Sequence, residues 1–182
     1  MSAHERGSPP ENAGRFGDDG AMKIRRLTPG DSALLRRLRL RALTDAPSAF
    51  GSTYEREEAF TDEEWRHRLR VDGHPHFVCE GPDGAAVGIA AGVRDDTDAA
   101  LAYLMSMWVA PDARGSGAAD GLIGRVIEWA RDEGIATIRL HVTEGNARAE
   151  RVYDRNGFSR TGTMIVRDHD GVAEGEMERR LR

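Results

Sequence analysis

A glycine-rich stretch near the middle of the chain carries the first chemical signal. It reads Val109-Ala-Pro-Asp-Ala-Arg-Gly-Ser-Gly-Ala-Ala-Asp120. It follows an apolar run, residues 104–109, and precedes a segment with helical period that extends to Ala130. This order predicts a strand, a tight turn and a helix N-terminus. Such a turn presents unpaired backbone N–H groups and the positive end of a helix dipole, and both favour phosphate binding.

Two common phosphate loops do not match this stretch. A Walker loop requires Lys and then Ser or Thr after its last glycine, and Ala118 and Ala119 occupy those places. A dinucleotide fingerprint requires a third glycine where this chain has Asp120. What remains is the pattern Arg-x-x-Gly-x-Ala, from Arg114 to Ala119, whose small residues let a ligand lie close to the backbone. Taken alone, a turn that only reverses the chain is an equally good interpretation.

A second constellation follows the turn. Asn146, Ala149, Tyr153 and Gly157-Phe158 form the pattern N-x-x-A-x-x-x-Y-x-x-x-G-F. Ala149 and Tyr153 are one helical turn apart and therefore share a face, and Asn146 is placed to cap the helix. A tyrosine on such a face is more often amphipathic core. Here Tyr153 lies one helical turn from a small residue, Ala149, and at a defined separation in sequence from the phosphate turn.

With these two segments, the chain resembles the GCN5-related N-acetyltransferase (GNAT) family from about Met22 to Leu181. The resemblance rests on V-x-P-x-x-R-x-x-G-x-A, on the Asn146 segment and on the element order; its one departure is Ala119, where many members have glycine. It implies a fold whose two central strands splay to admit the pantetheine arm of coenzyme A. The backbone of Met107, Trp108 and Val109 would pair with that arm, and Asn146 would touch it. The residues expected to wrap the pyrophosphate are Arg114, Gly115, Ser116, Gly117, Ala118, Ala119 and Asp120.

The resemblance implies direct transfer of an acetyl group from acetyl-CoA to an amine, with no covalent enzyme intermediate. The Val109 N–H would polarise the thioester carbonyl, and Tyr153 would protonate the departing thiolate. Tyrosine has a reference pKa of about 10, so it can donate a proton at neutral pH. A non-catalytic acyl-CoA-binding module is the alternative, and the presence of Tyr153 favours catalysis.

The general base is less well defined. His141 lies in the strand before Asn146, at a position where some family members that act on peptide amines carry a catalytic carboxylate. A histidine there could accept a proton near neutral pH, although a histidine on a sheet surface is an equally good interpretation. The resemblance places the acceptor site near Phe50 and the following carboxylates, Glu55, Glu57 and Glu58. These could bind a cationic amine, but an acidic run is more often solvated.

The elements that must position these residues follow from periodicity and turn signals. They predict an α/β fold, a mixed sheet with the order β-α-α-β-β-β-α-β-α-β-β. The expected helices are 31–46, capped by Asp31, one from Thr61 with capping-box spacing, one ending near Glu133, and 147–155. Arg36, Arg37, Arg39 and Arg41 should form a solvated face of the first helix, and residues 47–60 a loop. The expected strands are 22–27, 76–80, 86–94, the run ending at Val109, 135–142, 159–167 and 174–181.

Composition limits the class of protein. The 182 residues have a net charge of −5, which argues against a nucleic-acid-binding surface. Cys79 is the only cysteine, so an internal disulfide and a cysteine zinc site are excluded, and no metal is expected. No apolar run approaches the ~20 residues of a membrane span, and no signal core is present, which favours a cytoplasmic protein. Residues 1–21 should be a disordered tail before a single domain, 22–182. The resemblance implies an acceptor amine on a small molecule or a peptide without identifying it, and homodimers are common in the family.

Overall fold

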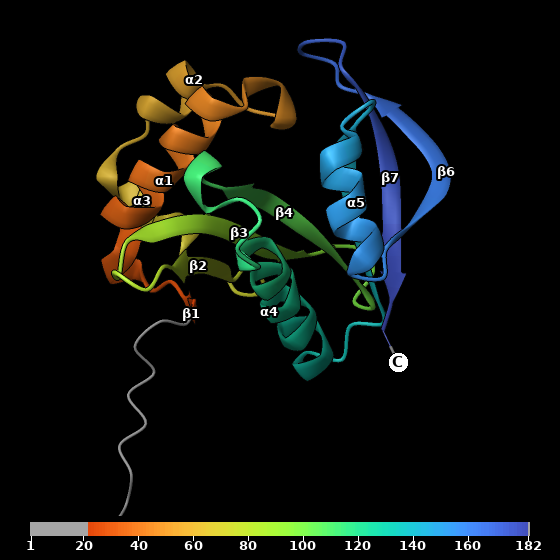
Figure 1. Ribbon diagram of the computed structural model, residues 1–182, viewed down its shortest axis with the longest axis horizontal. Coiled ribbons are helices and arrows are strands. Elements are labelled where there is room, and N and C mark those ends of the chain that lie inside the picture. Colours follow the sequence, from red (N-terminus) through yellow and green to blue (C-terminus); the bar gives the residue numbers. More distant parts are fainter. Residues whose placement is uncertain (1–21, 182) are drawn as a thin grey trace, which may run out of the picture.

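A seven-stranded mixed sheet organises the chain in the computed structural model, which describes residues 22–181. The strand order is β1-β2-β3-β4-β5-β7-β6, with β4 and β5 parallel and every other neighbouring pair antiparallel (Figure 1). The expectation of a disordered tail concerns residues 1–21, which lie outside the described residues. The strands are β1 (Lys23–Arg26), β2 (His76–Glu80), β3 (Ala86–Arg94), β4 (Leu101–Val109), β5 (Thr137–Thr143), β6 (Ser159–Val166) and β7 (Ala173–Arg180).

Five α-helices accompany the sheet among the described residues: α1 (Ser32–Asp45), α2 (Tyr54–Glu58), α3 (Asp62–Arg68), α4 (Ala118–Asp132) and α5 (Ala147–Arg155). The predicted mixed α/β fold and order of elements are confirmed, with one addition. The short helix α2 lies within residues 47–60, which were expected to be a loop. Thr53 caps it by accepting a hydrogen bond from the Arg56 N–H at 3.3 Å. A single helical turn is too short for its periodicity to be visible in the sequence.

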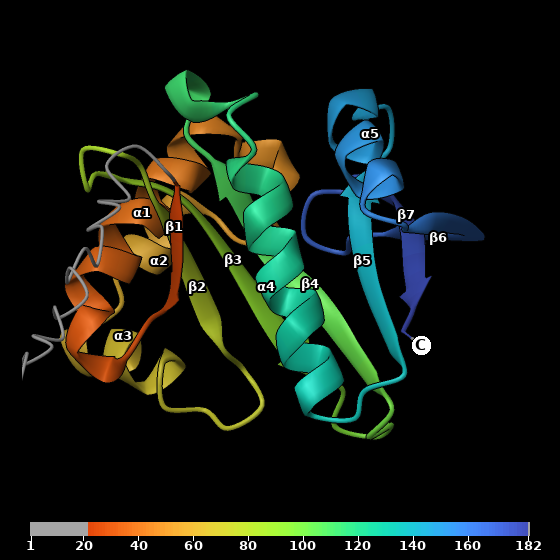
Figure 2. The same ribbon diagram turned by 60° about the horizontal axis from the view of Figure 1, so that its bottom comes forward.

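Helix α4 packs across β1 to β4 along its apolar face (Figure 2). The approach is close because β3 has no side chain at Gly92. A Cβ atom there would lie 2.3 Å from the Trp129 ring, so any larger residue would push the helix away. The glycine turn immediately precedes α4. The packing of α4 on the sheet therefore fixes where that turn sits relative to the end of β4.

A buried ion cluster joins α1, α2 and α3. The Glu57 carboxylate is 1% exposed, and it accepts hydrogen bonds from Arg39 at 2.9–3.2 Å and from Arg68 at 3.0 Å. The Arg39 guanidinium also lies 4.5 Å from the centre of the Phe50 ring. Burial alone would raise the pKa of Glu57, but hydrogen bonds from Arg39 and the charges of both arginines hold it below its usual value. The expectation of solvated charges is thus wrong for Glu57 and Arg39, because each is neutralised by a partner on another helix.

The two predicted helix starts differ in outcome. The capping box at Thr61 is confirmed: its hydroxyl accepts from the Glu64 N–H at 3.3 Å, and the Glu64 carboxylate accepts from the Thr61 N–H at 2.6 Å. Asp31 occupies the predicted N-cap position of α1, but its side chain makes no capping hydrogen bond there. Its carboxylate accepts from the Thr28 N–H at 2.8 Å and pairs with Arg25 at 2.9 Å, so it closes the preceding turn instead.

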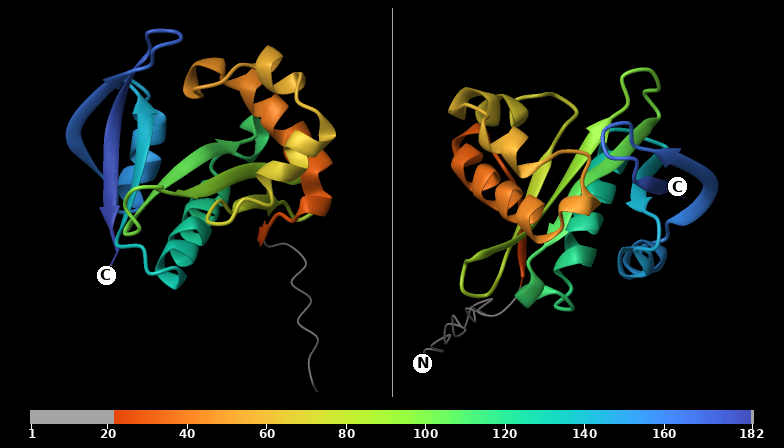
Figure 3. Two further views of the ribbon diagram at one scale, coloured as in Figure 1. Left: turned by 180° about the vertical axis from the view of Figure 1, so that it is seen from behind. Right: turned by 90° about the horizontal axis from the view of Figure 1, so that it is seen from above.

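Strands β4 and β5 pair only over their first residues. The ladder joins Leu101 to Thr137 and ends where Tyr103 meets Arg139, although β4 continues to Val109. A bulge bends β4 beyond this point, where Ser106 has a φ of +54°. The divergence is visible in Figure 2 and corresponds to the splay that the resemblance implied. Figure 3 shows α1 to α3 on one side of this opening and the α5, β7 and β6 unit on the other.

Candidate active site

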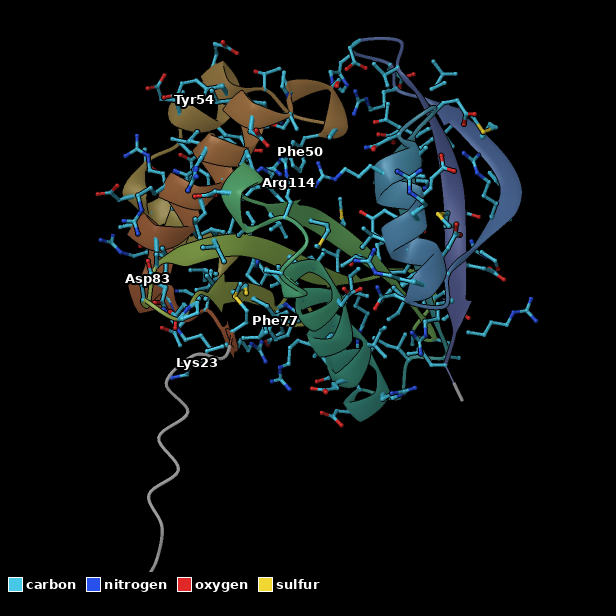
Figure 4. All side chains as sticks on the ribbon, viewed as in Figure 1. Lys23, Phe50, Tyr54, Phe77, Asp83 and Arg114 are labelled. Atoms are coloured by element: carbon cyan, nitrogen blue, oxygen red, sulfur yellow. The ribbon has the colours of Figure 1, made fainter. Side chains whose placement is uncertain are left out.

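A cavity of about 440 Å³ opens where β4, the glycine turn, α5 and the loop after α1 meet. Figure 4 shows Phe50 and Arg114 near each other on the side that faces α5. The structure brings ten of the predicted site residues to the cavity wall: Phe50, Met107, Trp108, Val109, Arg114, Gly115, Gly117, Ala119, Asn146 and Tyr153. Predicted residues that do not line it are Glu55, Glu57, Glu58, Ser116, Ala118, Asp120 and His141.

The turn between β4 and α4 depends on two glycines in the left-handed region. Gly115 has a φ of +88° and Gly117, the N-cap of α4, has a φ of +91°. Neither would bring a Cβ atom within 4 Å of another residue, so the space beside the turn is open to a ligand. Ser116 supports the turn from within, since its hydroxyl donates to the Ala113 carbonyl at 2.7 Å. An open turn at a helix N-terminus is suited to a phosphate group.

The first turn of α4 also contacts α5. Asp120 accepts hydrogen bonds from the Arg155 guanidinium at 2.8 and 2.9 Å and from the Asn156 amide at 2.6 Å. The Arg155 bond holds the pKa of the Asp120 carboxyl below its usual value. Ala118 is buried in the core. The side chains of Asp120 and Ala118 thus hold the turn in place, and it is their backbone N–H groups that begin the helix.

Val109 offers an open backbone donor at the end of β4. The next residue, Ala110, donates its N–H to Val87 of β3 at 2.8 Å. Because successive N–H groups of a strand point to opposite edges, the Val109 N–H points away from β3, toward the gap that separates β4 from β5. The Val109 carbonyl accepts from Arg114 Nε at 2.9 Å. The arrangement leaves a fixed N–H directed at the point where the two strands part.

Tyr153 reaches the same cavity from α5. Its side chain is 9% exposed and packs edge-to-face on Phe158, with ring centres 6.1 Å apart. Burial raises the pKa of Tyr153 to about 12. No residue within 22–181 forms a hydrogen bond with its hydroxyl. The predicted cap is confirmed, since Asn146 accepts from the Ala149 N–H at 3.2 Å, and Ala149 and Tyr153 line the cavity together.

His141 lies outside the cavity wall, on the face of β5 opposite buried Leu140. It comes two residues after the last β4–β5 pair, so it borders the mouth of the gap. Its ring stacks on Tyr103, with centres 6.1 Å apart. Its Nε2 lies 3.8 Å from a carboxylate oxygen of Glu176, which is its direct partner on β7. Glu176 is 9% exposed and also accepts from the Thr161 hydroxyl at 2.9 Å.

Sequence reasoning missed two groups of residues at this site. Glu176 belongs to the alternating carboxylates Glu174, Glu176 and Glu178, and period-two spacing on a strand was the available signal. The other group is the row of arginines along α5, Arg148, Arg151 and Arg155, all of which line the cavity. Their spacing of three and four residues places them on one helix face, a signal present in the sequence. Arg148 and Arg151 add positive charge to the cavity wall, whereas Arg155 is paired with Asp120.

Comparison with known proteins agrees with this geometry. The sequence model of the acetyltransferase (GNAT) family matches residues 39–158, which include β4, the glycine turn and α5. The chain belongs to the GNAT family of acetyltransferases. The cofactor predicted from the sequence is confirmed at the level of the family, since acetyl-CoA is the acetyl donor of GNAT enzymes. Among the described residues, no cluster of three or more potential metal ligands is present, and no helix is long and apolar enough to cross a bilayer.

Individual relatives match this chain at low sequence identity or over only part of its length. The chain is 38% identical over 86 residues to an uncharacterised N-acetyltransferase of Mycobacterium tuberculosis, covering 47% of this chain and 53% of that protein. It is 30% identical over 108 residues to an aminoglycoside N(6′)-acetyltransferase of Serratia marcescens, covering 56% and 74%. The spermidine N-acetyltransferase of Vibrio cholerae, crystallised with CoA and spermine, superposes with a TM-score of 0.70 at 18% identity, covering 87% and 95%. The chain spans about half the length of the curated relatives that it matches first.

Proposed function

We propose that this chain transfers the acetyl group of acetyl-CoA directly to a primary amine. The observation that carries the proposal is the single cavity shared by the glycine turn, the open N–H of Val109 and Tyr153. These groups come from separate elements, and each suits a different part of one reaction. Membership of the GNAT family supports the same reaction and donor.

The residues present fit coenzyme A. The open backbone of Gly115 and Gly117 suits the pyrophosphate, with Arg148 and Arg151 adding positive charge nearby. The unpaired edge of β4 from Met107 to Val109 can pair with the amide groups of the pantetheine arm, as an added strand pairs with a sheet edge. Acetyl-CoA would supply a thioester, whose carbonyl carbon accepts the amine.

Three groups of the chain have distinct parts in the transfer. As the amine nitrogen bonds to the acetyl carbon and the carbon–sulfur bond breaks, the nitrogen loses a proton to His141, which borders the mouth of the gap outside the cavity wall. The Val109 N–H donates to the carbonyl oxygen, where negative charge develops. Tyr153 gives its proton to the departing sulfur, and its raised pKa keeps the hydroxyl protonated throughout the neutral range. Glu176, 3.8 Å from His141, stabilises the imidazolium that forms.

The acceptor is an amine-bearing small molecule under this proposal. The Serratia relative is named for aminoglycosides and the Vibrio structure for spermidine, both of which carry primary amines. The test is thiol release from acetyl-CoA in the presence of spermidine, an aminoglycoside and short peptides with free N-termini. Wild type is compared with Tyr153→Phe, and CoA binding is measured by calorimetry for both.

We expect release with at least one amine, and its loss in Tyr153→Phe while CoA binding persists. CoA binding without release on any amine would instead support an acyl-CoA-binding module. Absence of CoA binding in the wild type would refute both functions.

A further inference from the structure

Asp45 occupies an unfavourable place for a carboxylate. It is the last residue of α1, where the helix dipole repels negative charge, and the last turn of α1 holds no basic residue. The compensation comes from β4 and the segment that follows it. Asp45 Oδ2 accepts a hydrogen bond from Trp108 Nε1 at 2.9 Å and forms a close ion pair with Arg114. A carboxylate held this way by residues 63 and 69 positions away points to a role beyond α1 itself.

Both partners of Asp45 border Val109. Trp108 is the preceding residue and is 4% exposed, so its indole is fixed in the core. Arg114 begins the glycine turn, and its Nε donates to the Val109 carbonyl at 2.9 Å. Its guanidinium is therefore shared between a carbonyl and a carboxylate. Asp45 thus holds the two side chains that set the position of the Val109 backbone.

The chain that follows Asp45 forms another wall of the same cavity. We call residues 46–50 the acceptor loop, and Ala46, Ala49 and Phe50 line the cavity. Further along the loop, the Ser48 carbonyl accepts from the Thr143 hydroxyl at 3.1 Å and from Arg167 Nη2 at 3.0 Å. The start of the acceptor loop is therefore connected to β4 through Asp45. Its middle is connected through Ser48 to Thr143 of β5 and to Arg167, on the opposite side of the gap.

We propose that Asp45 is a positioning residue that couples the acceptor loop to the glycine turn. CoA bound at the turn would restrain Arg114, and Asp45 would pass that restraint to the loop. Coupling between two sites is reciprocal, so an ordered loop would strengthen CoA binding by the same factor. This inference rests on the proposed function, which places CoA at the turn.

The experiment is hydrogen exchange of the full chain, with and without CoA, followed in peptides that cover residues 46–53. In the wild type we expect CoA to slow exchange of the loop amides by about fivefold or more. Asp45→Asn should abolish that slowing and weaken CoA binding by about the same factor. The matched control is Asp62→Asn, which removes the same charge from a side chain that is 75% exposed and that pairs with Arg36 on the outer side of α1.

Arg114→Gln provides a second route to the same link and should likewise abolish the CoA-dependent slowing of loop exchange, whatever further CoA affinity it loses at the cavity wall. In the double variant, CoA should change loop exchange no less than in either single variant, because both substitutions break one connection. Wild type that binds CoA without slower loop exchange would overturn the coupling and leave the proposed function standing. Full CoA-dependent slowing in Asp45→Asn would also overturn it. A wild type that fails to bind CoA would instead remove the proposed function.

Discussion

Replacing Tyr153 with phenylalanine removes one oxygen atom from the cavity and leaves the packing of the ring on Phe158 in place. The hydroxyl has no hydrogen-bond partner among residues 22–181, so the free energy of unfolding at pH 8 should be unchanged within about 0.5 kcal/mol. The rate should respond strongly. A positioned proton donor contributes about 10²–10⁴-fold, so we expect kcat to fall at least ~10²-fold with little change in CoA affinity.

The same substitution has a pH signature. Tyr153 has a pKa of about 12 in the folded chain, against about 10 in an unfolded one. A tenfold change in an ionisation constant equals about 1.4 kcal/mol, so ionisation of Tyr153 costs the folded state about 3 kcal/mol more than the unfolded state. Because the folded pKa is the higher one, this stability is present below about pH 10 and is lost as pH rises toward 12. At pH 11 about half of it is gone, roughly 1.4 kcal/mol.

Urea unfolding at pH 8 and pH 11 and steady-state kinetics test both parts. Relative to wild type, Tyr153→Phe should gain about 1.4 kcal/mol between the two pH values. Tyr54→Phe, which removes a surface hydroxyl bonded to Glu58, is the kinetic control and should keep full activity. An unchanged kcat in Tyr153→Phe would refute its role as proton donor. A loss of stability above about 1 kcal/mol at pH 8 would show that the hydroxyl has a structural role.

Three further substitutions have defined outcomes. Glu57→Gln should lower the free energy of unfolding by about 3 kcal/mol in urea, because buried Arg39 and half-buried Arg68 lose their charged partner, whereas exposed Glu55→Gln should have almost no effect. Because the pKa of Glu57 is lowered in the folded chain, its contribution to the free energy of unfolding is present above about pH 4.3 and is lost on acidification. Glu57→Gln should therefore lose less stability on acidification than wild type, and an equal loss would contradict the assignment. His141→Gln should lower kcat/KM about 10²-fold, while His169→Gln, in the β6–β7 turn, should match wild type; equal effects would exclude His141 as the base. Gly117→Ala should weaken CoA binding about tenfold by calorimetry: a φ of +91° strains alanine by about 1–2 kcal/mol, so the free turn relaxes away from that φ and CoA binding must restore it. Wild-type affinity would argue against pyrophosphate at this turn.

Local signals made much of the fold predictable. The glycine turn can be predicted from adjacent residues alone, because only glycine adopts without strain the φ values of +88° and +91° found at 115 and 117. The cap at Asn146 and the shared face of Ala149 and Tyr153 depend on spacings of three and four residues, which a helix converts directly into contacts. The splay of β4 from β5 was expected only through the family resemblance, and the bulge in β4 was not expected, since no local sequence pattern shows where two parallel strands separate.

Tertiary structure decided how charges and polar groups pair. Glu57 belongs to an acidic run, and such runs are normally solvated. It can be buried because Arg39 and Arg68, which lie on two other helices, pair with its carboxylate. Asp45, Trp108 and Arg114 form one network only after α1 packs beside the end of β4. The sequence by itself determined the elements, the turn and the helix face of Tyr153, since these depend on backbone preference and short spacing. Burial, ionisation and the closure of the cavity were decided only by tertiary structure, because each depends on which distant side chain comes within a few ångströms.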